Sequence, residues 1–247
     1  CSIAAVPVKS VEALAMQALH RVRKGMLRRR TAIGNQVRGL LLEHDIALPK
    51  GPLAMTDRLD RILEDATQPI PMRLREVIAD LQAEGRHLSE RLTLLTAKLE
   101  RSAAADATAQ RLMTVRGIGP INATALVAKE VLPERFANAR QFAAYFGLVP
   151  DQHSSGKTIR LGKMAKRGDR YLRGTLIEGA HSVLRRLDPD SAQPDDRRLQ
   201  RWLQRHGRKG AAVRLANRNL RIVWALLQNT DTYQRQPAPR GEVTMHA

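Results

Sequence analysis

Aromatic side chains, cysteine and acidic residues are all scarce in this chain of 247 residues. Aromatic residues make up only 3% of it, so the core has to be built from leucine, isoleucine, valine, alanine and methionine. Cys1 is the only cysteine, which excludes an internal disulfide, and the seven histidines lack the spacing of a zinc site. No apolar run approaches the roughly 20 residues of a membrane-spanning helix. These absences indicate a protein of a reducing, cytoplasmic compartment with no membrane contact.

Positive charge is in large excess. The chain has 42 lysines and arginines against 24 acidic residues, which gives a formal net charge of +18. A compact chain with this excess repels itself unless a polyanion is near, so nucleic acid is the leading class of partner. Arginine supplies 33 of the cations, and its planar guanidinium suits bidentate phosphate and base-edge contacts. The scarcity of aromatic residues argues against stacking on single-stranded bases as the main mode of binding.

A long helix is predicted from Ser10, as its N-cap, to about His44, and a shorter helix over residues 53–66. Apolar residues recur along the long helix at intervals of three and four, and the opposite face carries cations. The apolar positions are Val11, Ala15, Ala18, Val22, Met26, Ile33, Val37 and Leu40, and the cations are Arg21, Lys24, Arg28 and Arg38.

The most regular apolar spacing lies within residues 74–99. Its positions are Leu74, Ile78, Leu81, Gly85, Leu88, Leu92, Leu95 and Leu99. Alternating steps of four and three are those of a heptad seam. The helix either packs on its own domain or forms an intermolecular or antiparallel coiled coil. We favour the coiled coil, and with it a homo-oligomer, because four heptads exceed what one small domain usually buries.

After Asp106 the chain changes to short helices separated by glycines. The stretch Gly117-Ile118-Gly119-Pro120 lies between two of them and predicts a helix–hairpin–helix. Gly117 and Gly119 would let the backbone approach a phosphate, and Pro120 suits the first position of the second helix. An ordinary αα-turn capped by glycine is the alternative. Further helices are predicted near 138–146, 169–187, 195–206 and 210–228.

Residues 148–168 are predicted to form a polar loop, with or without a short hairpin. Seven cations lie in this loop or just after it, mostly at intervals of three, where they would follow a phosphate backbone. They are Lys157, Arg160, Lys163, Lys166, Arg167, Arg170 and Arg173. A solvated basic face is the alternative. Ser155-Gly156 is either a turn dipeptide or a serine presented as a nucleophile, with cations to stabilise the developing charge.

Several motifs follow one another in a fixed order and spacing. They are Gly117-Ile118-Gly119-Pro120, then Arg140-Gln141-Phe142-Ala143-Ala144-Tyr145 leading to Gly147-Leu148-Val149-Pro150, then Ser155-Gly156, then Lys166-Arg167-Gly168-Asp169 before Leu172-Arg173. So arranged, they closely resemble the C-terminal domain of bacterial insertion-sequence-110/1111 transposases. The stretches Ala211-Ala212-Val213, Ala216-Asn217 and Trp224-Ala225 are similar to the 1111 branch, and the likeness covers nearly the whole chain.

The resemblance implies a two-part enzyme. Members pair an N-terminal RuvC-like domain, whose Asp-Glu-Asp-Asp quartet binds divalent metal, with a C-terminal domain that supplies a serine nucleophile. That serine attacks DNA to form a covalent phosphoserine intermediate, and some members are guided by a structured non-coding RNA. The family serine stands immediately before glycine in the loop after Gly-Leu-x-Pro, which is Ser155 in this chain.

One part of the family pattern is missing. We find no acidic quartet, and Glu12 is the only acid in the first thirty residues. The chain therefore resembles the back half of a transposase, a fragment that holds the nucleophile without the metal site. We expect it to bind no cofactor itself, with Mg²⁺ held by the acidic domain of the full-length enzyme, and to bind nucleic acid without cutting it.

The expected fold is mainly α, with long helices and a coiled coil followed by a compact helical domain. Its expected parts are a helical segment over 1–70, the coiled coil over 71–106, the DNA-binding domain over 107–230 and a disordered tail over 231–247. The expected partners are DNA at transposon ends and target, a guide RNA in some members, and further copies of the chain, in a bacterial cytoplasm near the nucleoid. The alternative is a non-catalytic helix–hairpin–helix protein that organises nucleic acid.

Overall fold

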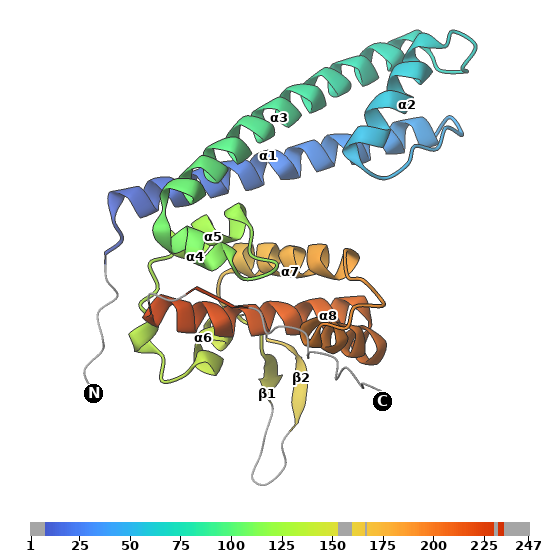
Figure 1. The fold of residues 1–247 in the computed structure, drawn as a ribbon. Coiled ribbons are helices and arrows are strands. Elements are labelled where there is room, and N and C mark those ends of the chain that lie inside the picture. The colour runs from blue at the N-terminus through green and yellow to red at the C-terminus, as the bar shows by residue number, and fades with distance from the viewer. Residues whose placement is uncertain (1–7, 153–159, 166, 230–231, 235–247) are drawn as a thin grey trace, which may run out of the picture. The chain divides into compact units, whose positions relative to one another are not determined.

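The computed structural model describes residues 8–152, 160–165, 167–229 and 232–234 (Figure 1). The prediction of a mainly α protein is confirmed, and no helix in these residues is long and apolar enough to cross a membrane. The helices are α1 (Val11–Leu42), α2 (Pro52–Glu64), α3 (Met72–Ala105), α4 (Ala107–Met113), α5 (Pro120–Val127), α6 (Ala139–Tyr145), α7 (Arg170–Arg185) and α8 (Pro194–Gln228), with a 3-10 turn at Pro133–Arg135. The strands are β1 (Pro150–Gln152) and β2 (Leu161–Met164), and they pair antiparallel.

The chain divides into two compact units. One consists of residues 17–98, and the other joins the segment before residue 17 to everything from residue 99 onward. Both divisions fall inside long helices, α1 and α3. The predicted ranges 1–70 and 71–106 thus both contribute helices to the 17–98 unit.

In the 17–98 unit, α1 and α3 run antiparallel. Arg23 Nε donates to Thr96 Oγ1 at 3.0 Å, while a Cβ added at Gly85 would lie 3.7 Å from Ile33 Cγ2. Residue 23 of α1 thus contacts residue 96 of α3, while residue 33 of α1 lies near residue 85. Since the contacts on α3 move toward its N-terminus as α1 proceeds toward its C-terminus, the helices point in opposite directions. Their buried apolar residues form one cluster with α2 and the turn after it: Ile33, Val37, Leu41, Leu59, Ile62, Ile70, Ile78 and Leu88. This part of the heptad seam therefore packs inside its own chain.

The face that α1 buries differs from the predicted one in its first half. Val11 and Val22 are 77% and 48% exposed, although the spacing placed them in the apolar stripe. His20 is buried instead, and burial, with the charge of Arg23, lowers its pKa to about 4, so it packs as a neutral side chain at pH 7. The prediction was wrong here because alanine and valine recur on more than one face of this helix, and α3 determines which face is covered.

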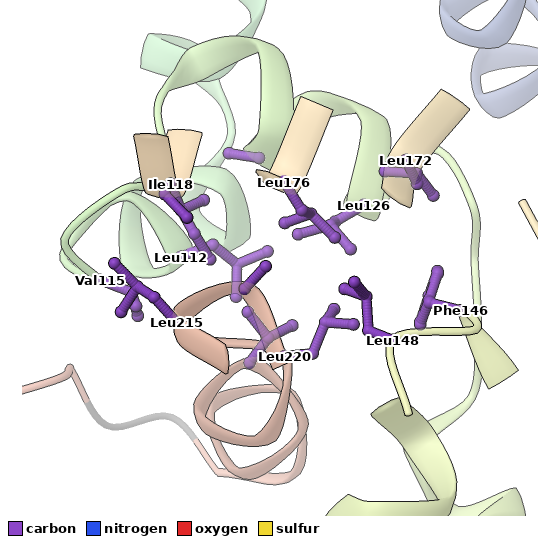
Figure 2. Close-up of a cluster of buried hydrophobic side chains, with 14 of the residues drawn as sticks. Leu112, Val115, Ile118, Leu126, Phe146, Leu148, Leu172, Leu176, Leu215 and Leu220 are labelled. Atoms are coloured by element: carbon purple, nitrogen blue, oxygen red, sulfur yellow. The ribbon is translucent and has the colours of Figure 1, made fainter. Parts of the chain in front are cut away.

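The other unit has a core formed by helices α4 to α8, in which α7 and α8 lie side by side (Figure 1). Figure 2 shows its aliphatic centre, where Leu112 of α4, Leu126 of α5, Leu176 of α7 and Leu220 of α8 meet. The composition suggested a purely aliphatic core, but the core also contains aromatic rings. All three phenylalanines of the chain pack against one another around α6, with ring centroids of Phe136 and Phe146 5.3 and 5.2 Å from that of Phe142.

Helix α8 is two helical segments joined at Gly207, whose φ of 63° and ψ of 175° interrupt the helix. This agrees with the break predicted between 206 and 210. The second segment turns back on the first, since Arg218 Nη2 lies 2.9 Å from Asp195 Oδ1. Leucines 199 and 215 are both buried, one in each segment.

Replacing Ile78 with alanine should lower the free energy of unfolding of the 17–98 unit by about 2–5 kcal/mol, because the fully buried side chain leaves a cavity. Since its neighbours belong to the same chain, the loss of Tm should not vary with protein concentration. Thermal unfolding followed by circular dichroism at several concentrations measures this, with Leu42→Ala, at a position of α1 that is 63% exposed, as the control. A loss that grows on dilution would show an intermolecular seam.

Candidate nucleic-acid interface

The turn between α4 and α5 is held from two other helices. Gly117 has a φ of 96°, and a Cβ there would lie 3.1 Å from Val183 Cγ2 and 3.2 Å from Asn219 Nδ2. Asn219 Nδ2 also donates to the Arg116 carbonyl at 3.0 Å. Gly117 is thus required by its backbone angle and by close packing on α7 and α8. A Cβ on Gly119 would meet no heavy atom within 4 Å, so the close packing that requires a glycine at position 117 does not apply at position 119.

The predicted basic loop begins and ends on the two paired strands. Pro150 of β1 stands opposite Met164 of β2, and the Ala165 amide donates to the Val149 carbonyl at 2.9 Å. Ser155 and Lys157 belong to the connection between the strands and lie outside the described residues, as does Lys166. The structure thus describes both strands that lead into and out of the predicted nucleophile segment.

Two glycines bring the segments before and after this strand pair into backbone contact. A Cβ on Gly147 would lie 2.1 Å from the Arg167 carbonyl oxygen, and one on Gly168 would lie 2.1 Å from the Tyr145 carbonyl oxygen. Both glycines have positive φ, 68° and 77°. Any side chain at either position would overlap the opposite backbone and would also be strained. We refer to this contact as the glycine crossing.

Arg173 holds the glycine crossing together. Its side chain comes from α7, is 7% exposed, and donates from Nη1 to the Phe146 carbonyl at 3.2 Å and to the Arg167 carbonyl at 2.7 Å. These two carbonyls belong to the two segments that cross. The cation spacing predicts Arg173 as a phosphate contact, but the structure places its guanidinium inside the protein. A buried arginine is stable where its donors meet acceptors, as here.

Asp169 is the N-cap of α7, directly after the crossing. Its carboxylate accepts from the amides of Tyr171 and Leu172 at 2.8 and 3.1 Å, and Lys129 Nζ lies 3.1 Å from its other oxygen. Burial alone would raise the pKa of Asp169, but the amide bonds and Lys129 outweigh it and hold the pKa below its ordinary value. This ion pair connects the start of α7, next to the crossing, to the segment that directly follows α5.

The other predicted cations of the loop differ in their surroundings. Arg160, Arg167 and Arg170 are exposed, and Arg167 Nη2 lies 3.5 Å from Asp151 Oδ1 on β1. Lys163 belongs to β2, where the structure describes the backbone but not the side chain. Arg170 begins α7 beside the crossing. Three exposed guanidiniums thus flank the base of the segment that contains Ser155.

A larger cationic feature was missed by the sequence analysis. A groove of about 1400 Å³ lies along α8 and is bounded on its other side by Leu148, Val149, Pro150 and strand β2. We call it the α8 groove. Its cations are Arg198, Lys209, Arg214, Arg218 and Arg221. Among the described residues that line it there is no acidic side chain, and both tryptophans of the chain, Trp202 and Trp224, are present.

A signal for this groove was present in the sequence. Residues 197–230 contain nine lysines and arginines and no aspartate or glutamate. The cations of this stretch occur at helical rather than loop spacing, so they are less conspicuous in the sequence than those of the glycine-punctuated loop. Which of them share a face with the tryptophans depends on the break at Gly207 and on packing against the strands, which composition does not give.

Comparison with known proteins identifies the family. Residues 109–195 match the family model described as Transposase IS116/IS110/IS902 family. A "probable family 20 transposase" of Pseudomonas aeruginosa is 43% identical over 230 residues, which cover 93% of this chain and 68% of that protein. The chain belongs to this family of insertion-sequence transposases. The region matched by the model contains most of α4, helices α5 to α7, the strand pair, the glycine crossing and Arg173.

Two further relatives agree with the assignment. The transposase for insertion sequence element IS1111A of Coxiella burnetii is 34% identical over 92% of this chain, and that for IS1328 of Yersinia enterocolitica is 36% identical over 86% of it. The chain spans 62% of the length of each of these two transposases. In the part of the transposase chain that the structure describes, no three histidine, cysteine or acidic side chains gather where they could hold a metal ion.

Asp169→Ala should lower the free energy of unfolding by about 1–2 kcal/mol near pH 7, because α7 loses its N-cap. The pKa of Asp169 is depressed in the folded state, so the stabilising contribution is complete above the unfolded pKa of about 3.9 and is lost as the pH falls through the folded pKa. Chemical denaturation of both proteins from pH 7 to pH 3 measures the difference.

The control is Asp169→Asn, which keeps a capping oxygen without the charge and should cost less than the alanine variant near pH 7. A gap between wild type and Asp169→Ala that stays constant or widens toward pH 3 would contradict the assigned role of the carboxylate.

Proposed function

We propose that this chain is the part of an insertion-sequence transposase that binds DNA and supplies the serine nucleophile, Ser155. The names of the relatives support the class of enzyme. The assignment of Ser155 as the nucleophile is supported mainly by the ordered structure on both sides of its loop. The glycine crossing, Arg173 and the paired strands fix both ends of the one connection that holds Ser155.

A fixed base suits a nucleophile because an attacking atom has to meet a phosphorus in line with the leaving oxygen. In the proposed step, Ser155 Oγ forms a bond to a DNA phosphorus while the bond from that phosphorus to a deoxyribose oxygen breaks. The serine hydroxyl loses its proton and the leaving deoxyribose oxygen gains one. Arg160, Arg167 and Arg170, which are exposed at the base of the loop, supply positive charge for the phosphoryl oxygens.

Mg²⁺ is proposed for the full-length enzyme, in its acidic domain, and the chain by itself is proposed to bind DNA without cutting it. The DNA partners proposed are the transposon ends and the target. A structured guide RNA is a further polyanion that the same exposed cations would accept.

Oligomerisation through α3 is also proposed, but through other positions than the predicted heptad seam. Ile78 and Leu88 pack within the chain, so a second copy would have to contact other positions of the helix. Leu94 and Val77 are 63% and 48% exposed and are available for such a contact.

Ser155→Ala in the full-length enzyme should abolish covalent attachment to DNA while leaving DNA affinity unchanged, because only the attacking oxygen is removed. Protein–DNA adducts on a nicked substrate are measured on a denaturing gel, and affinity is measured by fluorescence anisotropy. Ser154→Ala is the matched control and should retain the adduct. Adducts that persist in Ser155→Ala, or that disappear in Ser154→Ala, would overturn the assignment and favour a non-catalytic DNA-binding role for this loop.

A further inference from the structure

The α8 groove is lined by one face of the second segment of α8 and by Arg198, Trp202 and His206 of the first segment. Gly210, Val213, Asn217 and Trp224 recur at helical spacing along this face, and all line the groove. The facing wall is tied to the helix, because Asn217 Nδ2 donates to the Leu148 carbonyl at 2.9 Å just before β1. This wall of the groove is thus joined to the packed core, and Thr232, Tyr233 and Gln234, which follow α8, also line the groove.

The cations of the groove fall into two groups. Arg198 and Arg218 lie 3.7 and 2.9 Å from Asp195, which neutralises part of their charge. Lys209 and the exposed Arg214 and Arg221 have no acidic partner among the described residues. Arg214 and Arg221 are seven residues apart, two helical turns along the same face, while Lys209 lies about 140° from Arg214 around the helix, at the other edge of the groove. The groove thus has positive charge on both edges of this helix face, which a chain of phosphates would neutralise.

The lining between the cations is apolar and aromatic. Trp202 and Trp224 are each partly exposed, and Trp224 Nε1 donates to the Pro133 carbonyl at 3.1 Å, which fixes its ring. At about 1400 Å³ the groove is larger than a typical pocket for a single small molecule. A ligand that matches it is a polymer with repeated anionic groups and flat apolar faces.

An unpaired nucleic-acid strand has this chemistry and a duplex does not. Its bases are free to lie against aromatic rings while its phosphates meet the cations, whereas stacked and paired bases keep their faces covered. We propose that the α8 groove binds an unpaired stretch of DNA, with phosphates on Lys209, Arg214 and Arg221 and a base against Trp202.

The choice of DNA rests on the proposed function. Pro150 of β1 and Met164 of β2 line the groove, and the same two strands hold the connection that contains Ser155. A DNA strand processed at that connection would therefore have its neighbouring nucleotides within the reach of the groove. The groove would hold the unpaired strand in place while the exposed arginines of the loop base contact the phosphate under attack.

The two tryptophans provide a direct test, because no other tryptophan in the chain contributes to the fluorescence. Titration of the full chain with a 12-nucleotide oligothymidylate should quench tryptophan emission in parallel with binding measured by anisotropy. A 12-base-pair blunt duplex should quench less at equal occupancy. Binding of the oligothymidylate with no change in emission would overturn the proposal, as would equal or stronger quenching by the duplex.

Charge variants locate the strand. Arg214→Gln with Arg221→Gln should weaken oligothymidylate binding on the order of tenfold at moderate salt and reduce the slope of log affinity against log salt by about 0.7 for each phosphate that is no longer neutralised. The matched control, Arg201→Gln with Arg205→Gln, removes two exposed cations of α8 that do not line the groove. Equal losses of affinity in the two double variants would show that binding follows net charge and not the groove.

Stacking and the kind of nucleic acid are tested separately. Trp202→Ala should weaken binding at least about fivefold and Trp202→Phe much less, with circular dichroism confirming that both variants are folded. Binding of an oligouridylate tenfold tighter than oligothymidylate would overturn the commitment to DNA. Ser155→Ala should bind oligothymidylate with unchanged quenching. The two proposals can therefore be refuted independently. Absence of quenching would refute the proposed groove, and adducts that persist in Ser155→Ala would refute the proposed nucleophile.

Discussion

The glycine crossing is the contact on which the candidate site depends. Two backbone segments pass so closely at Gly147 and Gly168 that no side chain fits, and Arg173 donates to a carbonyl of each. Everything between the crossing segments, including both strands and the connection with Ser155, has its ends fixed at this point. A short loop of polar residues has little apolar surface of its own to bury, so its position has to come from the scaffold beneath it.

The same scaffold brings the two cationic features to adjoining places. Strands β1 and β2 lead into and out of the loop and also line the α8 groove, and Asn217 joins the groove helix to Leu148, just before β1. Low aromatic content suggested that base stacking would not be the main mode of binding. Low aromatic content is a weaker argument against stacking in the structure, because both tryptophans of the chain line one cationic groove. The proposed binding of an unpaired strand therefore depends on two aromatic residues at a single site.

Sequence alone predicted much of this organisation and missed the parts that depend on packing. The helical character, the turn at Gly117 and the break near Gly207 follow from periodicity and glycine, which act locally. The inward course of Arg173 could not be predicted, because its spacing matches that of the exposed cations and only the carbonyls around it decide its direction. The covered face of α1 depends on α3, and the α8 groove depends on residues far apart in the chain.

Amide hydrogen exchange measures most directly whether the crossing holds the strand pair. Arg173→Met keeps much of the side-chain volume and removes both hydrogen bonds to the crossing carbonyls, while Arg170→Met makes the same change at an exposed position of α7. The account predicts faster exchange at the Ala165 amide, which bonds to Val149, in Arg173→Met and wild-type exchange in Arg170→Met. Unchanged exchange at this amide in Arg173→Met would show that the strand pair is held without the arginine, and would contradict the account.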